Sequence, residues 1–337
     1  MNEYLNIFID EDYPHFLDKY LNTKTMDRIK YVTQFCGCYY TKLYSTKFLY
    51  TRFNHSLVVA HMVWHFTHNK NETIAALLYD AGTPCFAHCI DYVFGDYINQ
   101  ESSERKISDV IKNDEELLSY LKEDGIAIED LENLSKYPIL ENKSPKLCAD
   151  RLDGVFHTCY IWLHTHKLQE IKEVYDGMTV LINEDNNPEI GFIDQKIANK
   201  FVEMVFIYAK ELQGNTDKYI MKYVSEIVKL AFERNLITLD DLYTMKESDL
   251  CSCFKENFPS WSIFENANTL TNTDNLPEKN FYISFTTKKR NTIPLVKTKD
   301  SVARINTVSE YANKIYQEYE RFIAPKYAYV KELKKLN

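Results

Sequence analysis

The sequence of 337 residues has little glycine and proline, with eight and nine of them. Because both residues interrupt helices and build tight turns between strands, their scarcity favours long helices over a turn-rich all-β fold. The sequence also lacks any apolar run near the roughly 20 residues that a membrane-spanning helix needs. No membrane association is therefore expected. The acidic first residues lack the basic start of a secretory signal, which predicts a cytoplasmic protein.

Positive charge is also in short supply, because 40 Lys and Arg stand against 49 Asp and Glu, for a net charge of −9. Nucleic-acid backbones are bound by clustered Lys and Arg, so no extended nucleic-acid surface is expected. A local basic pocket for a small phosphate ester is compatible with this balance. The eight cysteines include two C-x-C pairs but no C-x-x-C knuckle. A structural zinc site is therefore weakly supported, and the thiols are expected to stay reduced.

A helix is predicted to begin near His55, followed by apolar residues at helical spacing: Val58, Val59, Met62, Val63 and Phe66. His55 lies one turn before Val59, so it points toward the same buried face. A second set of histidines, His61, His65 and His68, lies on another face of this helix. Such a set can hold a metal, but a solvated face is the preferred interpretation.

The next helix is expected to start with Asn71 as its cap and to stop at Gly82, which places Tyr79 and Asp80 in its last turn. A carboxylate at this end faces the negative pole of the helix dipole. A bound cation would relieve that cost, whereas an exposed polar end is the alternative interpretation.

A third helix is predicted to start at Ser144 and Pro145, a serine cap followed by proline in the first position. Asp150, Asp153 and His157 follow at i, i+3 and i+7, so they share one face. Three polar groups on one face of an otherwise apolar helix indicate a site more than a surface.

The predicted fold class is all-α, with a helical core, a small β-hairpin insertion near 178–193 and a small C-terminal sheet near 281–298. The hairpin is expected from MTVLI and EIGFI around the turn EDNNP, and the sheet from the alternation of Phe281, Ile283 and Phe285 before IPLVK. Three parts are expected: an N-terminal helical segment packed on the core (1–50), the helical core (51–260), and a C-terminal extension with short strands and a terminal helix (261–337).

Several motifs together resemble the HD superfamily of metal-dependent phosphohydrolases, in particular the branch of deoxynucleoside triphosphate triphosphohydrolases. In chain order they are Arg52-Phe53-x-His55-Ser56-Leu57, then Leu77-Leu78-Tyr79-Asp80-x-Gly82 with Pro84, Phe86 and His88, and Asp150-Arg151-Leu152-Asp153. DLYTMKESDL and KKRNTIPLV also resemble that branch. The resemblance covers residues 45–330. It implies an HD-domain helical core, a small phosphate-containing ligand such as a nucleotide, and a homo-oligomer.

The resemblance implies a metal site as well. The family holds its metal with a His, a consecutive His-Asp pair and a late Asp, and His55, Asp80 and Asp150 stand at three of these positions. A cation held there polarises a phosphoryl group and activates water for attack. Tyr79 stands at the fourth position, and its phenol is a poor ligand because it titrates near pH 10. A divalent metal (Mn, Mg, Fe, Ni or Zn) is therefore expected to bind weakly or not at all.

His88 and Asp91 match a catalytic His and its Asp partner, which implies a general acid whose tautomer the carboxylate fixes. Four residues are expected to bind the phosphate or the rest of the substrate: Arg52, Arg151, Tyr79 and Asp153. Two family histidines are absent, because Thr83 or Pro84 stands at one position and Gln100-Glu101 at the other. Gly154 replaces a nucleotide-contacting Tyr, so nucleotide specificity does not carry over.

Two functions stay open. The first is an HD-superfamily phosphohydrolase, or a close derivative, that acts on a nucleotide or another small phosphate ester through an atypical metal site. The second is a catalytically degenerate HD fold that serves as a nucleotide-binding or protein-interaction module. An HD-type oxygenase with a metal pair is disfavoured, because it needs more His ligands between the motifs.

Overall fold

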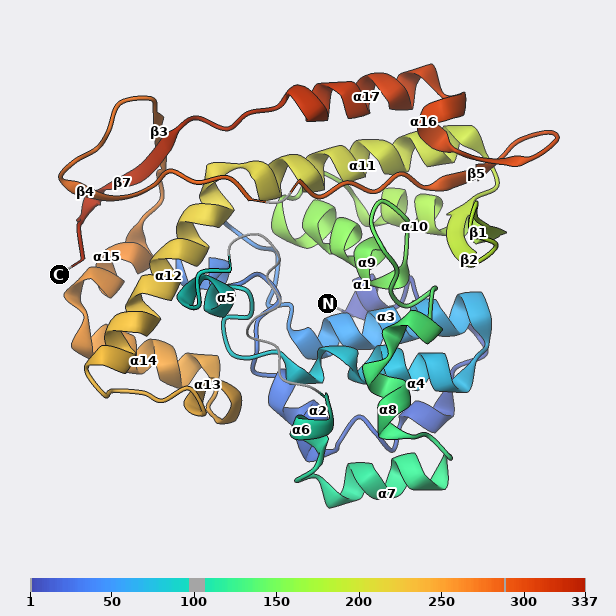
Figure 1. The fold of residues 1–337 in the computed structure, drawn as a ribbon, viewed down its shortest axis with the longest axis horizontal. Helices are drawn as coiled ribbons and strands as arrows, with labels where there is room; N and C mark the ends of the chain where they lie inside the picture. Colours follow the sequence, from blue (N-terminus) through green and yellow to red (C-terminus); the bar gives the residue numbers. More distant parts are fainter. Residues whose placement is uncertain (1, 97–106, 288, 337) are drawn as a thin grey trace.

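The computed structural model describes residues 2–96, 107–287 and 289–336. Helices make up most of these residues, and two small sheets lie toward the C-terminal part of the chain (Figure 1). The fold is thus predominantly helical, and the all-α class is too narrow for it. The predicted position Gln100-Glu101 lies outside the described residues.

The N-terminal segment forms short helices joined by turns: α1 (Asn2–Leu5), η1 (His15–Leu17), α2 (Lys24–Ile29) and η2 (Cys38–Tyr40). The following stretch up to Trp162 contains α3 (Arg52–Thr67), α4 (Lys70–Leu78), η3 (Tyr79–Gly82), α5 (Cys89–Val93), α6 (Ile107–Ile111), α7 (Glu115–Glu123), α8 (Ile128–Glu132), η4 (Leu134–Lys136), α9 (Ala149–His157) and η5 (Thr158–Trp162). Helix α3 packs against α4, η3 and α9. Its N-terminal end faces residues of η3 and α9.

The remaining helices follow the β-hairpin or flank it: α10 (Leu168–Asp176), α11 (Gln195–Gln213), α12 (Asn215–Glu233), α13 (Asp241–Thr244), α14 (Glu247–Asn257), α15 (Pro259–Asn266), α16 (Ile305–Val308) and α17 (Glu310–Arg321). Helices α11 and α12 are the longest, and α17 lies along α11 (Figure 1). None of the helices in the described ranges has both the length and the apolar character required to span a bilayer.

Helix caps differ from the predicted ones at two starts. Helix α4 is capped by Asn69 rather than Asn71, because the Asn69 side chain accepts the backbone N–H groups of Asn71 and Glu72. Helix α9 begins at Ala149 after Cys148, and the predicted start at Ser144 and Pro145 lies in the preceding loop. The α9 start is therefore later, and Asp150 falls in its first turn.

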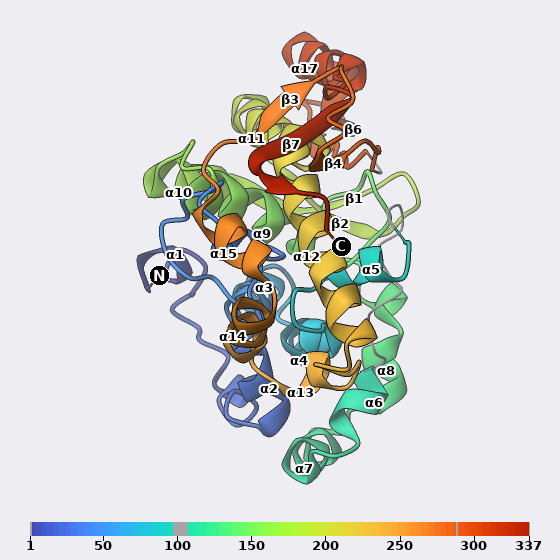
Figure 2. The same ribbon diagram turned by 90° about the vertical axis from the view of Figure 1, so that its left-hand side faces the viewer.

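The predicted hairpin is present as β1 (Met178–Ile182) and β2 (Pro188–Phe192), which pair antiparallel. Two C-terminal strands, β5 (Leu295–Lys297) and β6 (Val302–Arg304), extend it to a four-stranded sheet of order β1-β2-β5-β6. A separate sheet has the order β3-β7-β4, from β3 (Thr271–Thr273), β4 (Asn280–Ile283) and β7 (Tyr327–Lys334). Figure 2 shows this second sheet beside α12. The predicted terminal helix is present as α17, which ends at Arg321, and the strand β7 follows it as an element that was not predicted.

The predicted solvated histidine face is wrong for His61, which is 2% exposed. The N-terminal segment covers α3 at this point, and the Tyr13 ring lies 5.3 Å from the imidazole of His61. His65 and His68 are more exposed and approach Asp10 and Asp12 of the same segment. The three histidines are therefore held by N-terminal residues and do not form a metal site together.

Candidate functional site

Three elements bring the predicted motifs together. His55 lies in the first turn of α3, Tyr79 and Asp80 lie in η3, and Asp150 and Asp153 lie in α9. The side chain of Thr51 accepts the backbone N–H of Asn54, and this capping box fixes the start of α3. We call His55, Tyr79, Asp80, Asp150 and Asp153, together with Arg52, the central cluster.

His55 is the hub of this cluster. Its Nδ1 lies 2.5 Å from Asp153 Oδ2, and its Nε2 lies 3.1 Å from Asp150 Oδ1. Burial alone would lower the pKa of His55, but the hydrogen bonds and charges of Asp150 and Asp153 raise it to about 10. His55 is therefore an imidazolium at neutral pH, and both of its ring nitrogens donate.

The phenol of Tyr79 contacts both His55 and Asp150. Its hydroxyl lies 2.5 Å from His55 Nε2 and donates to Asp150 Oδ1 at 2.8 Å. Burial and the nearby charge of Asp150 raise the pKa of Tyr79 well above its usual value, so the hydroxyl keeps its proton. The pKa of Asp150 is lowered: burial opposes this, but the hydrogen bond and charge of His55 outweigh it.

Asp80 is neutralised by a neighbour from α3. Arg52 donates from an Nη atom to Asp80 Oδ2 at 2.9 Å, and the Thr83 hydroxyl donates to the other carboxylate oxygen at 3.0 Å. Burial would raise the pKa of Asp80, but the guanidinium of Arg52 lowers it. Because both side chains are buried, removing either partner would leave an uncompensated charge.

Asp153 is the fully buried carboxylate of the central cluster. Its carboxylate accepts the hydroxyls of Tyr4 at 2.5 Å and of Tyr50 at 2.9 Å, besides the contact with His55. The carboxylate thus fixes the orientation of the His55 ring and ties it to the N-terminal segment. Tyr4 and Tyr50 were missed by sequence reasoning, because no local pattern distinguishes them from the other aromatic residues of 1–50.

Candidate metal ligands are present, but in a different combination from the predicted one. Within the described ranges, the potential ligand atoms of His55, Asp153 and His157 lie within 4.8 Å of one another, and so do those of Glu141, Cys148 and Asp150. The predicted set of His55, Asp80 and Asp150 is not among these groups. Burial lowers the pKa of His157 to about 4, so its imidazole is neutral, as a metal ligand must be.

As they lie, the predicted ligands do not fit a cation. The Tyr79 hydroxyl occupies the space next to His55 Nε2 and Asp150, and Arg52 already pairs with Asp80. In addition, a protonated His55 has no lone pair to offer a metal. A divalent ion at this point requires the phenol to move and the imidazole to lose its proton.

His88 and Asp91 form the predicted pair. His88 Nδ1 lies 2.9 Å from Asp91 Oδ2, with Asp91 fully buried and the His88 side chain 29% exposed. A buried carboxylate at Nδ1 fixes the proton there and leaves Nε2 for proton exchange. The pair therefore has the arrangement of a general acid or base.

Arg151 is bound by the loop that precedes α9. Its Nε donates to the Lys146 carbonyl at 2.9 Å, one Nη donates to Glu141 at 2.9 Å, and the other Nη donates to Asn142. All three guanidinium nitrogens are thus engaged by the loop that precedes α9. Arg151 thus holds this loop in place, and its predicted role as a phosphate ligand stays a prediction.

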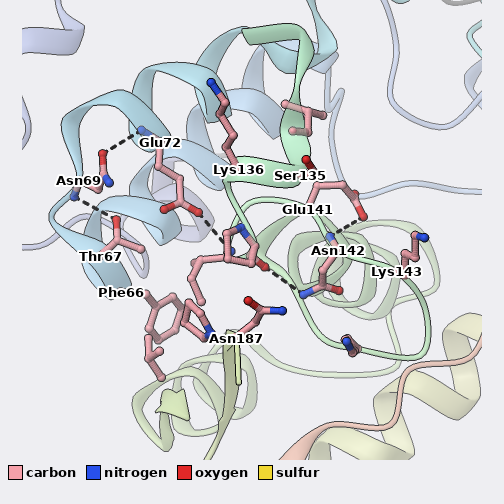
Figure 3. Close-up of a pocket in the computed structure, with 16 residues that line it drawn as sticks. Phe66, Thr67, Asn69, Glu72, Ser135, Lys136, Glu141, Asn142, Lys143 and Asn187 are labelled. Atoms are coloured by element: carbon pink, nitrogen blue, oxygen red, sulfur yellow. Dashed lines mark hydrogen bonds between the residues drawn. The ribbon is translucent and has the colours of Figure 1, made fainter. Parts of the chain in front are cut away.

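Beside this loop lies a pocket of about 880 Å³ (Figure 3). Its walls come from the α3–α4 junction, the loop before α9 and the β1–β2 hairpin: Phe66, Thr67, Asn69, Glu72, Leu134, Ser135, Lys136, Pro138, Ile139, Glu141, Asn142, Lys143, Lys146, Val180, Asn187 and Pro188. Glu141 belongs both to this wall and to the group of Cys148 and Asp150. The pocket therefore borders the central cluster through one carboxylate.

No family model matches the chain. The uncharacterised protein YdhJ of Bacillus subtilis strain 168 is 24% identical over 227 residues, which are 67% of this chain and 67% of that protein. A hypothetical protein of Aquifex aeolicus has a similar structure, with a TM-score of 0.59, 18% identity, and coverage of 94% of this chain and 92% of the other.

A phosphohydrolase of Bacteroides thetaiotaomicron VPI-5482 also has a similar structure, with a TM-score of 0.59, 14% identity, and coverage of 97% of both chains. At these identities the likeness establishes the fold alone. The chain shares the fold of that protein over almost its whole length, and it contains a cluster of candidate metal ligands.

Proposed function

We propose that this chain binds a nucleotide or another small phosphate ester at the central cluster and hydrolyses it, as an HD-like phosphohydrolase with an atypical metal site. The observation that carries the proposal is the convergence of His55, Asp80 and Asp150 from three separate elements onto one point. His55 Nε2 lies 3.1 Å from Asp150 and 4.0 Å from Asp80. The phosphohydrolase-like fold supports the same function.

The net charge of the central cluster determines whether it would bind a phosphate ester alone or together with a cation. Two positive groups (Arg52 and the imidazolium of His55) face three carboxylates (Asp80, Asp150 and Asp153), which gives the cluster a net charge of −1. A bare phosphate is repelled by such a group, whereas a nucleotide that brings its own Mg²⁺ is attracted. Asp150 is the accessible carboxylate, with 30% of its side chain exposed. The expected ligand is therefore a magnesium–nucleotide complex.

His88 is assigned the proton transfer. A water oxygen attacks phosphorus and loses a proton to solvent, the bond from phosphorus to the leaving oxygen breaks, and His88 gives its Nε2 proton to that oxygen and takes another from solvent. Asp91 accepts the Nδ1–H of His88 and so fixes the orientation of the ring. General acid catalysis of this kind contributes about 10²- to 10⁴-fold to a rate.

A second function, ligand binding without turnover, is favoured by one observation. The Tyr79 hydroxyl satisfies both His55 and Asp150, so the cluster is hydrogen-bonded without any ion. A protein that only senses a nucleotide needs no activated water. The two functions predict the same ligand and differ in turnover.

The test combines binding and turnover. Calorimetric titration with nucleoside triphosphates is expected to give tighter binding with Mg²⁺ than with EDTA, and Asp150→Asn is expected to remove that difference. Phosphate release from the same panel is expected to fall about 100-fold in His88→Gln, with binding nearly unchanged. Lys314→Ala, which changes an exposed pair on α17, serves as the control. Mg²⁺-dependent binding without release would select the second function, and no binding at all would refute both.

A further inference from the structure

The pocket beside the central cluster has an unusual charge balance for this chain. Three lysines and two glutamates line it, so its formal charge is +1, whereas the whole chain carries −9. The lysines are Lys136, Lys143 and Lys146, and they come from the loop before α9 and from η4. Positive charge is thus gathered at this pocket in an acidic protein.

Both glutamates of the wall are committed to the protein itself. Glu72 Oε1 accepts the backbone N–H groups of Ile139 and Leu140, each at 3.1 Å. Glu141 accepts Arg151 at 2.9 Å and the backbone N–H of Asn142 at 2.8 Å. Their negative charge is therefore largely compensated before a ligand enters.

Two of the three lysines are also paired with the protein itself. Lys136 pairs with Asp130 and Lys146 with Asp185, and neither aspartate lines the pocket. Lys143 is exposed and forms no ion pair with any residue in the described ranges. Figure 3 shows Lys143 and Lys136 on different sides of the pocket, with Asn142 next to Lys143 and Asn187 beside the hairpin. The side-chain amide of Asn142 already donates to the carbonyls of Pro138 and Leu147, so an anion in the pocket has the ammonium group of Lys143 and the amide of Asn187 within its walls.

Part of the wall is apolar. Phe66 of α3, Pro138 of the loop before α9, and Val180 and Pro188 of the hairpin contribute apolar side chains to it. A volume of about 880 Å³ lies within the usual range of small-molecule sites, about 300 to 1,000 Å³. The walls thus suit a ligand with a compact apolar part and an anionic end.

We propose that this pocket is a second ligand site, which takes a small organic anion with a phosphate or phosphonate group and an apolar ring. The apolar ring packs near Phe66 and Pro138, and the anionic end meets Lys143. Glu141 and Asn142 of the same wall hold Arg151, and a carboxylate oxygen of Glu141 lies within 4.8 Å of one of Asp150, so the pocket adjoins the central cluster. The site is distinct from the nucleotide position proposed at His55.

Phenylphosphonate is a suitable probe, since it joins a ring to a non-hydrolysable anion. Calorimetric titration of the full chain is expected to show one binding event, with a Kd raised about fivefold or more in Lys143→Glu. Lys314→Glu makes the same charge reversal on the exposed face of α17. It is expected to change Kd less than twofold, because salt screens the interaction between distant exposed charges. Lys143 is exposed, so the variant is expected to keep its far-UV spectrum and its Tm.

Binding of phenylphosphonate at the central cluster is the outcome that would contradict the second site. If phenylphosphonate binds at His55 instead, Asp150→Asn will alter its Kd and Lys143→Glu will not, which overturns the second site. Absence of binding at millimolar concentration also overturns it. Mg²⁺–nucleotide binding is expected to survive Lys143→Glu, so a failure of this site leaves the proposed function to be judged by its own experiment.

Discussion

The hydroxyl of Tyr79 is the group that lies next to both His55 and Asp150. A histidine at this position would add a neutral nitrogen ligand to the three predicted ones, whereas the phenol adds a hydrogen-bond donor with a raised pKa. The proton on His55 then supplies positive charge next to Asp150 and Asp153, and the neutral phenol adds a hydrogen bond to Asp150. The phenol thus satisfies the hydrogen bonds of His55 and Asp150 without an ion.

Tyr79→His is expected to increase the affinity for Mn²⁺ or Co²⁺ about tenfold or more, because it adds an imidazole ligand and removes the hydroxyl from the space beside His55 Nε2. Calorimetry with Mn²⁺ and the visible absorption of bound Co²⁺ measure this directly. Tyr79→Phe is the matched control, since it removes the hydroxyl and adds no ligand. Equal affinity in Tyr79→His and Tyr79→Phe would contradict the prediction, and tighter binding by the unmodified chain than by Tyr79→Phe would make the phenol itself a ligand.

At the residue scale, spacing predicted that Asp150, Asp153 and His157 share one helix face, and the resemblance to the HD superfamily implied that His55, Asp80 and Asp150 meet. The sequence did not predict the partners that hold them. Tyr4 lies 149 positions from Asp153, and nothing near Tyr4 in the sequence marks it as a donor. Arg151 is similar: its neighbours in sequence suggest a phosphate contact, but Glu141 and Asn142 compete for its guanidinium in the folded chain.

At the element scale, one buried ion pair joins strands that are not neighbours. Glu189 on β2 is fully buried, and Arg304 at the end of β6 donates to its two oxygens at 2.5 and 2.8 Å across the intervening β5. Glu189 also accepts the backbone N–H of Leu147 at 3.0 Å, in the loop before α9. The pair thus connects the hairpin, the C-terminal strands and the approach to Asp150.

Arg304→Ala is expected to lower the free energy of unfolding by about 3 kcal/mol, since it leaves the Glu189 carboxylate buried without its cation. Urea unfolding followed by circular dichroism measures the loss. Arg304→Ala combined with Glu189→Gln is expected to lose less than Arg304→Ala alone, because no charge is then left uncompensated. Lys314→Ala breaks an exposed pair with Glu310 and is expected to leave the free energy of unfolding nearly unchanged. A similar small cost for Arg304→Ala would show that water reaches Glu189.

Element boundaries show where local sequence stops being informative. Asn69 and Asn71 are both good caps, and the choice between them depends on how α3 ends at His68 in the left-handed conformation. The hairpin was predictable from its alternating residues and its turn. Strand β7 was not, because a Lys-rich segment at the end of a chain resembles a helix surface until β3 and β4 are available to pair with it.

At the scale of the whole molecule, the C-terminal strand closes the structure. Strand β7 is the central strand of its sheet, and its buried residues Ala328, Val330 and Leu333 pack toward α12 and α15. The backbone N–H of Val330 also donates to the Tyr219 hydroxyl of α12 at 3.4 Å. The last residues therefore support α12, one of the two longest helices, although they lie far from it in sequence.

Removal of residues 326–337 is expected to unfold the chain at a much lower temperature, because β3 and β4 lose their shared partner and the apolar face of α12 meets water. Full burial of one Val or Leu side chain is worth about 1.5 to 3 kcal/mol, so Val330 and Leu333 alone carry a large part of the about 5 to 15 kcal/mol that stabilises a typical domain. Val330→Ala and Leu333→Ala test the same contact without truncation, and each is expected to lower Tm in a thermal scan. Removal of residues 335–337 alone keeps β7 intact and is expected to change Tm little. If the longer truncation melts at the same temperature as the full chain, β7 is an addition to the fold and α12 is held by its other neighbours.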